Sequence, residues 1–144
     1  VTGTVTSLAV DTGAVRWTTQ CCAEGIFATP VLYGAGSLLV SLRSGELRCL
    51  CVASGEQRWS LKVADAALTS AGIDDRLACV GSANGTLAAI QLGSESEPPG
   101  LMCRHRLPAA MFASPLVRGD TVVVGCRDDH LHCFRLGQGV QQSS

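Results

Sequence analysis

The 144-residue sequence has few aromatic residues, only two tryptophans, one tyrosine and three phenylalanines, so its core must be built from smaller side chains. Charged residues make up 16% and the formal net charge is −1, which gives no electrostatic reason to expect nucleic acid or an anionic membrane as a partner. No apolar run approaches the roughly 20 residues of a membrane-spanning helix. The sequence starts with neither a methionine nor a leader peptide, so we expect it to begin inside a longer protein.

Cysteine, by contrast, is abundant, with eight residues. In a secreted protein an even number would suggest disulfides. However, Cys49 and Cys51 are two residues apart in one predicted strand and share a face, and Cys79 and Cys133 stand where other repeats have apolar residues. We therefore expect small buried thiols, a reducing compartment and a cytoplasmic location.

The sequence repeats itself. Residues 44–59 (SGELRCLCVASGEQRW) align without a gap on residues 2–17 (TGTVTSLAVDTGAVRW). Further segments that begin at Phe27, Leu68 and Phe112 align with one another at spacings of 40 to 44 residues. Repeats of about 40 to 45 residues are typical of the four-stranded blades of β-propellers.

Each repeat is predicted to contain four short strands separated by glycine turns. β-Branched and alternating residues fill the strands, and no stretch has a sustained helical period. The predicted fold class is therefore all-β: a partial β-propeller of four-stranded antiparallel blades, with about three blades of a larger ring. In the first complete repeat the predicted strands are Phe27–Leu32, Ser37–Leu42, Leu47–Val52 and Gln57–Lys62.

The repeats divide the chain into blades. We predict a partial blade at residues 1–26, full blades at 27–66 and 67–110, an incomplete three-stranded blade at 111–136, and a disordered polar tail at 137–144. Closed propellers have typically 4–8 blades, so the outer faces of this set would be uncovered. The remaining blades of a parent chain are thus the first expected partners.

Two endings, TGAVRW at 12–17 and SGEQRW at 54–59, resemble the tryptophan-docking motif of pyrroloquinoline quinone (PQQ) repeats, the quinoprotein alcohol dehydrogenase-like propellers. The ATP and ASP triplets at 28–30 and 113–115 are similar to the start of the inner strand in such repeats. In that family the tryptophan of one blade packs on the glycine turn of a neighbouring blade. The positions that this implies here are Trp17 and Trp59 with Gly13 and Gly55.

The sequence also departs from the family pattern. Ala9 and Cys51 replace the usual aspartate three residues before the Thr-Gly pair, and the tryptophan position of the second full blade holds Cys103. A Pro-containing loop, GSESEPPG at 93–100, interrupts the same blade. We expect weaker docking at one boundary between blades and a loop that projects from the rim.

The last repeat, VVVGCRDDHLHCFRL, and the tolerated cysteines resemble the C-terminal propeller of adenylate-forming, acyl-CoA-synthetase-like enzymes that activate β-alanine with ATP. That resemblance implies a non-catalytic scaffold or interaction module, attached to upstream domains and open to protein partners. Two alternatives remain: a fragment of a PQQ-dependent dehydrogenase, and a PQQ-type scaffold propeller of an assembly complex.

Adjacent cysteines, as in Cys21-Cys22, form a disulfide against the quinone in PQQ dehydrogenases, so this pair could indicate cofactor binding. It lies, however, in the connection that leaves a predicted outer strand. The sequence shows neither a tryptophan platform nor a set of carboxylate and amide oxygens for Ca²⁺. We therefore expect two reduced cysteines and no cofactor.

Cys126, His130, His132 and Cys133 cluster in the last repeat and are residue types that bind zinc. Their spacing is neither that of a zinc finger nor that of a zinc ribbon, and Cys133 aligns with Ala89, which favours a core position. We therefore predict no metal site from these residues.

The other polar groups are better explained by local structure. Paired acids in turns hydrogen-bond their own backbone, a serine without flanking glycines makes no nucleophile elbow, and a three-residue basic run is too short to bind nucleic acid. We therefore assign no catalytic, cofactor-binding or metal-binding residue. The groups in question are Asp74-Asp75, Asp128-Asp129, Ser114 and Arg104-His105-Arg106.

Overall fold

The computed structural model describes residues 2–95, 97–137 and 140–143. Within these residues every regular element is a β-strand, as the alternating pattern predicts. No helix among them is long and apolar enough to cross a membrane.

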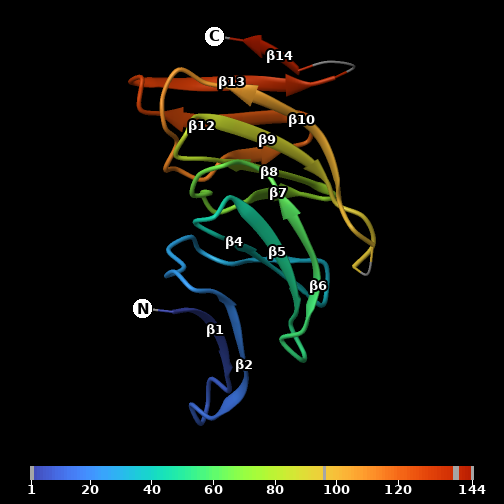
Figure 1. Cartoon of the computed structure of the whole chain (residues 1–144). Coiled ribbons are helices and arrows are strands. Elements are labelled where there is room, and N and C mark those ends of the chain that lie inside the picture. Colours follow the sequence, from blue (N-terminus) through green and yellow to red (C-terminus); the bar gives the residue numbers. More distant parts are fainter. Residues whose placement is uncertain (1, 96, 138–139, 144) are drawn as a thin grey trace.

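The strands form four antiparallel sheets, which we number in chain order (Figure 1). Sheet 1 has two strands, and sheets 2, 3 and 4 have four each, with every strand beside its neighbour in sequence. Sheet 1 contains β1 (Gly3–Leu8) and β2 (Val15–Cys22); sheet 2 contains β3 (Val31–Tyr33), β4 (Ser37–Ser41), β5 (Glu46–Cys51) and β6 (Gln57–Lys62); sheet 3 contains β7 (Gly72–Asp74), β8 (Leu77–Gly81), β9 (Thr86–Gln91) and β10 (Gly100–Arg106); sheet 4 contains β11 (Leu116–Arg118), β12 (Thr121–Cys126), β13 (His130–Leu136) and β14 (Val140–Ser143).

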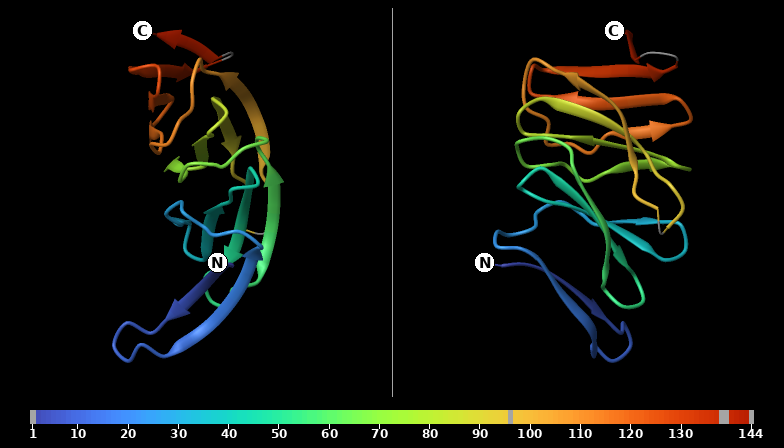
Figure 2. Two further views of the ribbon diagram at one scale, coloured as in Figure 1. Left: turned by 60° about the vertical axis from the view of Figure 1, so that its left-hand side comes forward. Right: turned by 45° about the vertical axis from the view of Figure 1, so that its right-hand side comes forward.

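The sheets stack face to face into an open arc, with sheet 1 at one end and sheet 4 at the other (Figure 2). Strands β2, β6 and β10 run along the convex side of the arc (Figure 2). No described strand of sheet 1 pairs with a strand of sheet 4, so the ring is not closed within this chain. The predicted fold class, a partial propeller of antiparallel blades, is confirmed.

The core lies between the sheets rather than inside any one of them. In sheet 2, Leu39 and Leu47 face sheet 3, whereas Val40 and Leu50 face sheet 1, and all four are at most 1% exposed. Successive residues of a strand point to opposite faces, so a blade with neighbours on both sides is apolar on both faces. The third apolar cluster, centred on Phe134, lies between sheets 3 and 4.

Small side chains let the sheets approach each other. Sheet 3 places Ala78 and Ala88 on one face and Cys79 and Ala89 on the other, all buried. The chain thus builds its core with few aromatic rings, because alanine and cysteine leave room for the leucines and valines of the adjoining sheets.

In the first complete blade, the observed strand bounds follow the prediction for the second, third and fourth strands and differ for the inner strand. In the first complete blade, β6 has the predicted bounds, and β4 and β5 are shifted or shortened by one residue at their ends. The inner strand was predicted over Phe27–Leu32, but β3 covers only Val31–Tyr33. Pro30, which has no N–H to donate to the ladder, marks this boundary.

The end of the chain also differs from the prediction. Residues 137–144 were expected to be a disordered tail after a three-stranded blade, yet Val140–Ser143 form β14 and pair with β13, with Phe134 opposite Gln142. The edge of β13 presents unpaired backbone groups, which an extended polar segment can satisfy. Residues 138, 139 and 144 of the predicted tail lie outside the described residues.

Candidate functional site

The segments that precede β3, β7 and β11 surround a hollow of about 610 Å³. Three hydroxyl side chains at equivalent repeat positions line it: Thr29, Ser70 and Ser114. The Ser70 Oγ accepts a hydrogen bond from the Thr29 N–H at 2.7 Å. This hydroxyl therefore links two neighbouring blades.

Two arginine–phenylalanine pairs occupy equivalent positions at the rim of this hollow. The Arg43 guanidinium carbon lies 5.4 Å from the centre of the Phe27 ring, and that of Arg127 lies 5.7 Å from the Phe112 ring. Both rings are largely exposed, whereas the corresponding Leu68 of the middle blade is buried. Each cation thus covers an aromatic face that would otherwise be in water.

The hollow offers hydrogen-bond donors but no catalytic constellation. Among the described residues that line it, Arg43 is the charged one, and none is an acid, a histidine or a cysteine. Acid–base and nucleophilic catalysis need such groups within hydrogen-bond reach. Ser114 lines the hollow, and none of the described residues around it is a histidine or an acid. The hollow therefore has the residues of a structural surface rather than those of an active site.

The boundaries between adjacent sheets, which we call seams, carry the most specific contacts. At the seam of sheets 1 and 2, the Trp17 Nε1–H donates to the Val52 carbonyl at 2.8 Å. The ring covers Gly55 so closely that a Cβ there would lie 2.4 Å from Trp17 Cε3. Thr19 Oγ1 adds a hydrogen bond to the Gly55 carbonyl at 2.6 Å. The docking that the motif implied for Trp17 is present.

At the seam of sheets 2 and 3, Trp59 is buried, with 6% exposure, among the apolar residues that the two sheets share. The loop at 93–100 leads from β9 to β10, at the place where sheet 2 has the short turn with Gly55 between β5 and β6. This loop does not simply project from the rim, because its Gly93 carbonyl accepts a hydrogen bond from the Tyr33 hydroxyl in β3 of sheet 2. Gly93 is therefore tied to sheet 2.

Glu95 makes the main polar contacts of this loop. Its carboxylate accepts hydrogen bonds from the Ala35 N–H at 2.9 Å and the Gly36 N–H at 2.8 Å, and it pairs with Arg58 at 3.1 Å. The Gly36 hydrogen bond first, and then the Arg58 guanidinium, hold the pKa of Glu95 below its ordinary value. These contacts hold the carboxylate at the β3–β4 turn of sheet 2.

At the seam of sheets 3 and 4 the tryptophan position is Cys103, which packs against the apolar residues that the two sheets share. The Gly119 N–H donates to Asp74 Oδ2 at 2.6 Å across the same seam. His105 places its ring edge against Phe134 at 5.1 Å, and Arg104 Nε donates to the Val63 carbonyl at 2.8 Å. The short basic run thus includes two residues that join blades.

Cys21 and Cys22 lie at the end of β2, where the pairing with β1 shifts register. Cys21 is buried against sheet 2, and burial raises the pKa of its thiol. Cys22 Sγ lies against Gly3 and donates to the Glu24 carbonyl at 2.9 Å. The described residues contain no disulfide bond. Cys21 belongs to the apolar cluster between sheets 1 and 2, and Cys22 packs against the same cluster.

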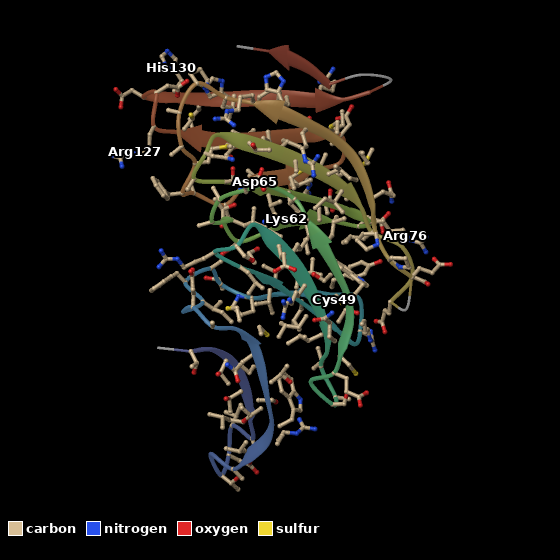
Figure 3. The ribbon with its side chains drawn as sticks, viewed as in Figure 1. Cys49, Lys62, Asp65, Arg76, Arg127 and His130 are labelled. Atoms are coloured by element: carbon tan, nitrogen blue, oxygen red, sulfur yellow. The ribbon has the colours of Figure 1, made fainter. Side chains whose placement is uncertain are left out.

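Of the four zinc-type residues in the last repeat, from which no metal site was predicted, the structure brings Cys126 and His132 together with Asp128. Ligand atoms of Cys126, Asp128 and His132 all lie within 4.8 Å of one another. His130 is exposed beside them, and Figure 3 shows it near Arg127 at the end of sheet 4. Cys133 points to the opposite face of β13 from His132, since neighbouring residues of a strand alternate.

Asp75, Asp128 and Asp129 occupy turns, as predicted, whereas Asp74 is the last residue of β7. Asp75 and Asp129 have positive φ angles of 50° and 67°, a conformation that aspartate tolerates better than most residues. Asp74 contributes to a seam, whereas Asp128 folds back toward β13 and accepts a hydrogen bond from His132 Nε2 at 2.7 Å.

The repeat geometry matches a known family. A PQQ_2 family model, described as outer membrane protein assembly factor BamB, covers residues 1–142. The chain belongs to this family. Together with the strand arrangement, membership makes the chain a propeller scaffold of the PQQ/BamB type.

Solved structures of the same fold include two designed proteins and one natural one. The computationally designed Ika8 protein has a TM-score of 0.79 at 16% identity, over 93% of this chain and 40% of that one. The designed Ika4 protein also reaches 0.79 at 16% identity, over 94% of this chain and 81% of that one. BamB from Moraxella catarrhalis has a TM-score of 0.76 at 18% identity, over 93% of this chain and 44% of that one.

At such identities the likeness shows the fold alone. The chain spans less than half the length of the Ika8 and BamB chains. Comparison with curated protein sequences gives no match.

Reading the sequence alone missed the contacts of Glu95, Tyr33 and Asp128. The glycines of the YGAG turn, Gly34 and Gly36, were the available signal for Glu95. A Cβ on either would lie within 3.1 Å of its carboxylate oxygens, so the turn leaves room for an acid. No spacing rule pointed to the partners of Tyr33 or Asp128, because both contacts depend on how a loop or turn folds back.

Proposed function

We propose that this chain forms the terminal blades of a closed propeller that serves as a non-catalytic scaffold in a larger protein. Further blades would cover both ends of the arc. The ring would bind upstream domains of the same protein and other proteins, rather than nucleic acid or a membrane.

One comparison between two glycine turns carries the proposal. Gly13 and Gly55 hold the same repeat position and similar positive φ angles, 70° and 76°. Trp17 covers Gly55, whereas a Cβ on Gly13 would meet nothing within 4 Å. The turn at Gly13 thus has the form of an acceptor for an aromatic ring from a preceding blade.

The opposite end of the arc supports the same proposal. Leu116 and Leu131 of sheet 4 are 68% and 75% exposed. Val123 of β12 pairs with Leu116 and therefore lies on the same face of the sheet. Sheets 2 and 3 bury both faces, so an uncovered apolar face in sheet 4 is one that a further blade would cover.

For the parent protein we propose an adenylate-forming enzyme that activates β-alanine with ATP, located in the cytoplasm. Support comes from the resemblance of the last repeat to such enzymes and from cysteines that are buried as thiols, Cys21, Cys49 and Cys79 among them. Catalysis would lie in the upstream domains. The hollow before β3, β7 and β11 is lined by no described acid, histidine or cysteine that could act as a catalytic acid, base or nucleophile.

The ring can be tested with two matched substitutions. In the 144-residue chain, Gly13→Ala should cost only the strain of a positive φ, about 1–2 kcal/mol, and Gly55→Ala should cost more because it also displaces Trp17. In the full-length protein, Gly13→Ala should become as costly as Gly55→Ala. If Gly13→Ala cost the same in the 144-residue chain and in the full-length protein, no aromatic side chain of a preceding blade would cover Gly13.

The parent enzyme has a separate test. The full-length protein should catalyse β-alanine-dependent exchange between ATP and pyrophosphate, and deletion of these 144 residues should leave the exchange rate unchanged. Absence of exchange would reject the adenylate-forming parent. Loss of exchange in a deletion variant that remains folded would reject the non-catalytic role.

A second candidate is a scaffold of an assembly complex, favoured by the description of the matched family. Such a protein would carry a secretory leader upstream and would co-purify with outer-membrane assembly partners. A PQQ-dependent dehydrogenase fragment is less well supported, because Cys21 is buried between sheets 1 and 2 and Cys22 packs against the same apolar cluster. Stoichiometric binding of PQQ by the full-length protein would restore that candidate.

A further inference from the structure

The hairpin between β12 and β13 gathers three different metal-binding groups. The Sγ of Cys126, a carboxylate oxygen of Asp128 and a ring nitrogen of His132 all lie within 4.8 Å of one another. We propose that these three residues form a Zn²⁺ site, with the fourth position taken by water or by His130.

The strand register fixes two of the ligands on one face. Cys126 is the last residue of β12 and pairs with His130, while His132 pairs with Val124. Paired and alternate residues share a face of the sheet, so Cys126 and His132 both face sheet 3. The site is therefore positioned by a rigid element rather than by a free loop.

The turn brings the third ligand to the same place. The Arg127 N–H donates to the Ala110 carbonyl at 3.0 Å, which ties the turn to the segment before β11. Asp128 Oδ1 accepts a hydrogen bond from the His130 N–H at 3.2 Å, and Asp128 Oδ2 lies 2.7 Å from His132 Nε2. The carboxylate thus points back along β13 toward the imidazole.

The distances suit a tetrahedral ion. Zinc bonds to sulfur at about 2.3 Å and to nitrogen or oxygen at about 2.0–2.2 Å, which places neighbouring ligand atoms about 3.2–3.8 Å apart. The Asp128–His132 contact would open by about 1 Å on binding, within reach of small side-chain rotations.

The surroundings favour a metal with affinity for sulfur and nitrogen. The side chains of His132 and Asp128 are only 11% and 17% exposed, and the His132 ring stacks on Phe134 at 6.3 Å. Ca²⁺ and Mg²⁺ prefer sites made of oxygen atoms, whereas a thiolate–imidazole–carboxylate set suits Zn²⁺.

The arrangement does not fit a cysteine nucleophile. In such a site the imidazole bonds to the thiol and the carboxylate orients the imidazole. Here the Cys126 Sγ donates to the Ala109 carbonyl at 3.3 Å, and His132 Nε2 bonds to Asp128 Oδ2 at 2.7 Å, so the thiol proton is directed to a backbone carbonyl and not to the imidazole. All three side chains converge on a common point, which is the geometry of a binding site.

Exposed His130 is the candidate for the fourth ligand. Its side chain is 72% exposed, its ring centre is 6.1 Å from that of His132, and its Nδ1 is 3.8 Å from Asp128 Oδ1. A rotation of this side chain would bring a ring nitrogen toward the ion. Without it, water would complete the tetrahedron.

The site can be tested with Co²⁺ and Zn²⁺ on the purified, metal-stripped protein. We expect one equivalent of Co²⁺ to bind with the absorption of a tetrahedral, thiolate-ligated ion, and Zn²⁺ to displace it. Cys126→Ser and His132→Gln should each weaken binding at least tenfold, as loss of a ligand exceeds the about 10–100-fold effect of outer contacts. Cys22→Ser, a thiol change in sheet 1, should leave binding unchanged, and His130→Gln should have the smallest effect in the hairpin.

A second measurement needs no variant. Zn²⁺ should slow alkylation of Cys126 in the unaltered protein, measured peptide by peptide with mass spectrometry, and leave Cys22 unaffected. Absence of a Co²⁺ thiolate band would overturn the proposal. It would also fail if Zn²⁺ did not protect Cys126, or if affinity survived both Cys126→Ser and His132→Gln.

Discussion

The Nε1–H of Trp17 donates to the carbonyl of Val52 across the seam of sheets 1 and 2, at 2.8 Å. The donor lies at the end of one repeat and the acceptor in the turn of the next, 35 residues later. A single side chain thus joins two blades by a hydrogen bond and by contact of its ring with Gly55. It acts together with the Thr19–Gly55 hydrogen bond and the apolar cluster that sheets 1 and 2 share.

Substitution of Trp17 should separate these two contributions. Trp17→Phe keeps an aromatic ring over Gly55 and removes the hydrogen bond, and we expect a loss of about 1 kcal/mol. Trp17→Ala removes both and should cost about 2–3 kcal/mol, less than a fully buried tryptophan. Chemical denaturation of the folded protein measures both values. Equal costs for the two variants would mean that the ring contact contributes nothing.

Trp59 should be the more costly of the two tryptophans. It is 6% exposed and lies in the largest apolar cluster, between sheets 2 and 3. Trp59→Ala should lower the free energy of unfolding by about 3–5 kcal/mol, as for other large buried aromatic residues. Equilibrium denaturation of the folded protein is the measurement. A cost near zero would show that Trp59 does not join the two blades.

The length of the repeat and the alternation of residues within it predicted the antiparallel blades and the middle strands of the first complete blade. The β-bulges beside Trp17, Trp59 and Cys103 recur at the equivalent place in three sheets, so position within the repeat determines local geometry even where the tryptophan is lost. The repeat pattern could not predict the return of the 93–100 loop, because Glu95 binds N–H groups far away in sequence.

Backbone pairing at an edge and side-chain convergence in a turn were also beyond the pattern. Residues 140–143 pair with β13 through the backbone, which any extended sequence can do. The meeting of Cys126, Asp128 and His132 depends on a turn with a positive φ at Asp129, which residue spacing alone does not reveal.

The contribution of Glu95 should depend on pH. Its pKa in the folded protein lies below the ordinary value of 4.5, chiefly because of the Gly36 N–H and then Arg58. A depressed carboxyl pKa stabilises the folded state above the unfolded-state pKa, and that stabilisation is lost as the pH falls through the folded-state pKa. Glu95→Gln should therefore lower Tm at pH 7.

The difference in Tm between this variant and the unaltered protein should shrink as the pH falls below 4.5. Glu56→Gln, a change in an exposed acid in the turn after β5, is the control and should show a smaller difference at pH 7. A difference in Tm for Glu95→Gln that is independent of pH would mean that the charge of the carboxylate is not what anchors the loop.

The cysteines should differ strongly in reactivity. Hydrogen bonds, first from the Ser54 side chain and then from the Ser54 and Ala53 amides, lower the pKa of Cys51 to about 7. Burial raises the pKa of Cys79 to about 12. Because the thiolate is the nucleophile, Cys51 should react with iodoacetamide at neutral pH and Cys79 should not.

The rate at Cys51 should rise with pH and level off above pH 7, and Ser54→Ala should move that midpoint upward. Cys79 should react only after denaturation. Peptide mass spectrometry after timed alkylation gives both rates. Equal rates at Cys51 and Cys79 in the folded protein would contradict the assignment.

The uncovered face of sheet 4 should make the isolated chain associate with itself. Leu131 is 75% exposed, and this apolar face is the kind that buries itself against another sheet. Sedimentation velocity should show oligomers that grow with concentration, and Leu131→Glu should shift the distribution toward monomer, because a charge resists desolvation at such a contact. Val10→Glu, at a fully exposed turn position, should leave association unchanged. A monodisperse monomer at every concentration would mean that sheet 4 needs no covering blade, and the argument for a larger ring would then rest on Gly13 alone.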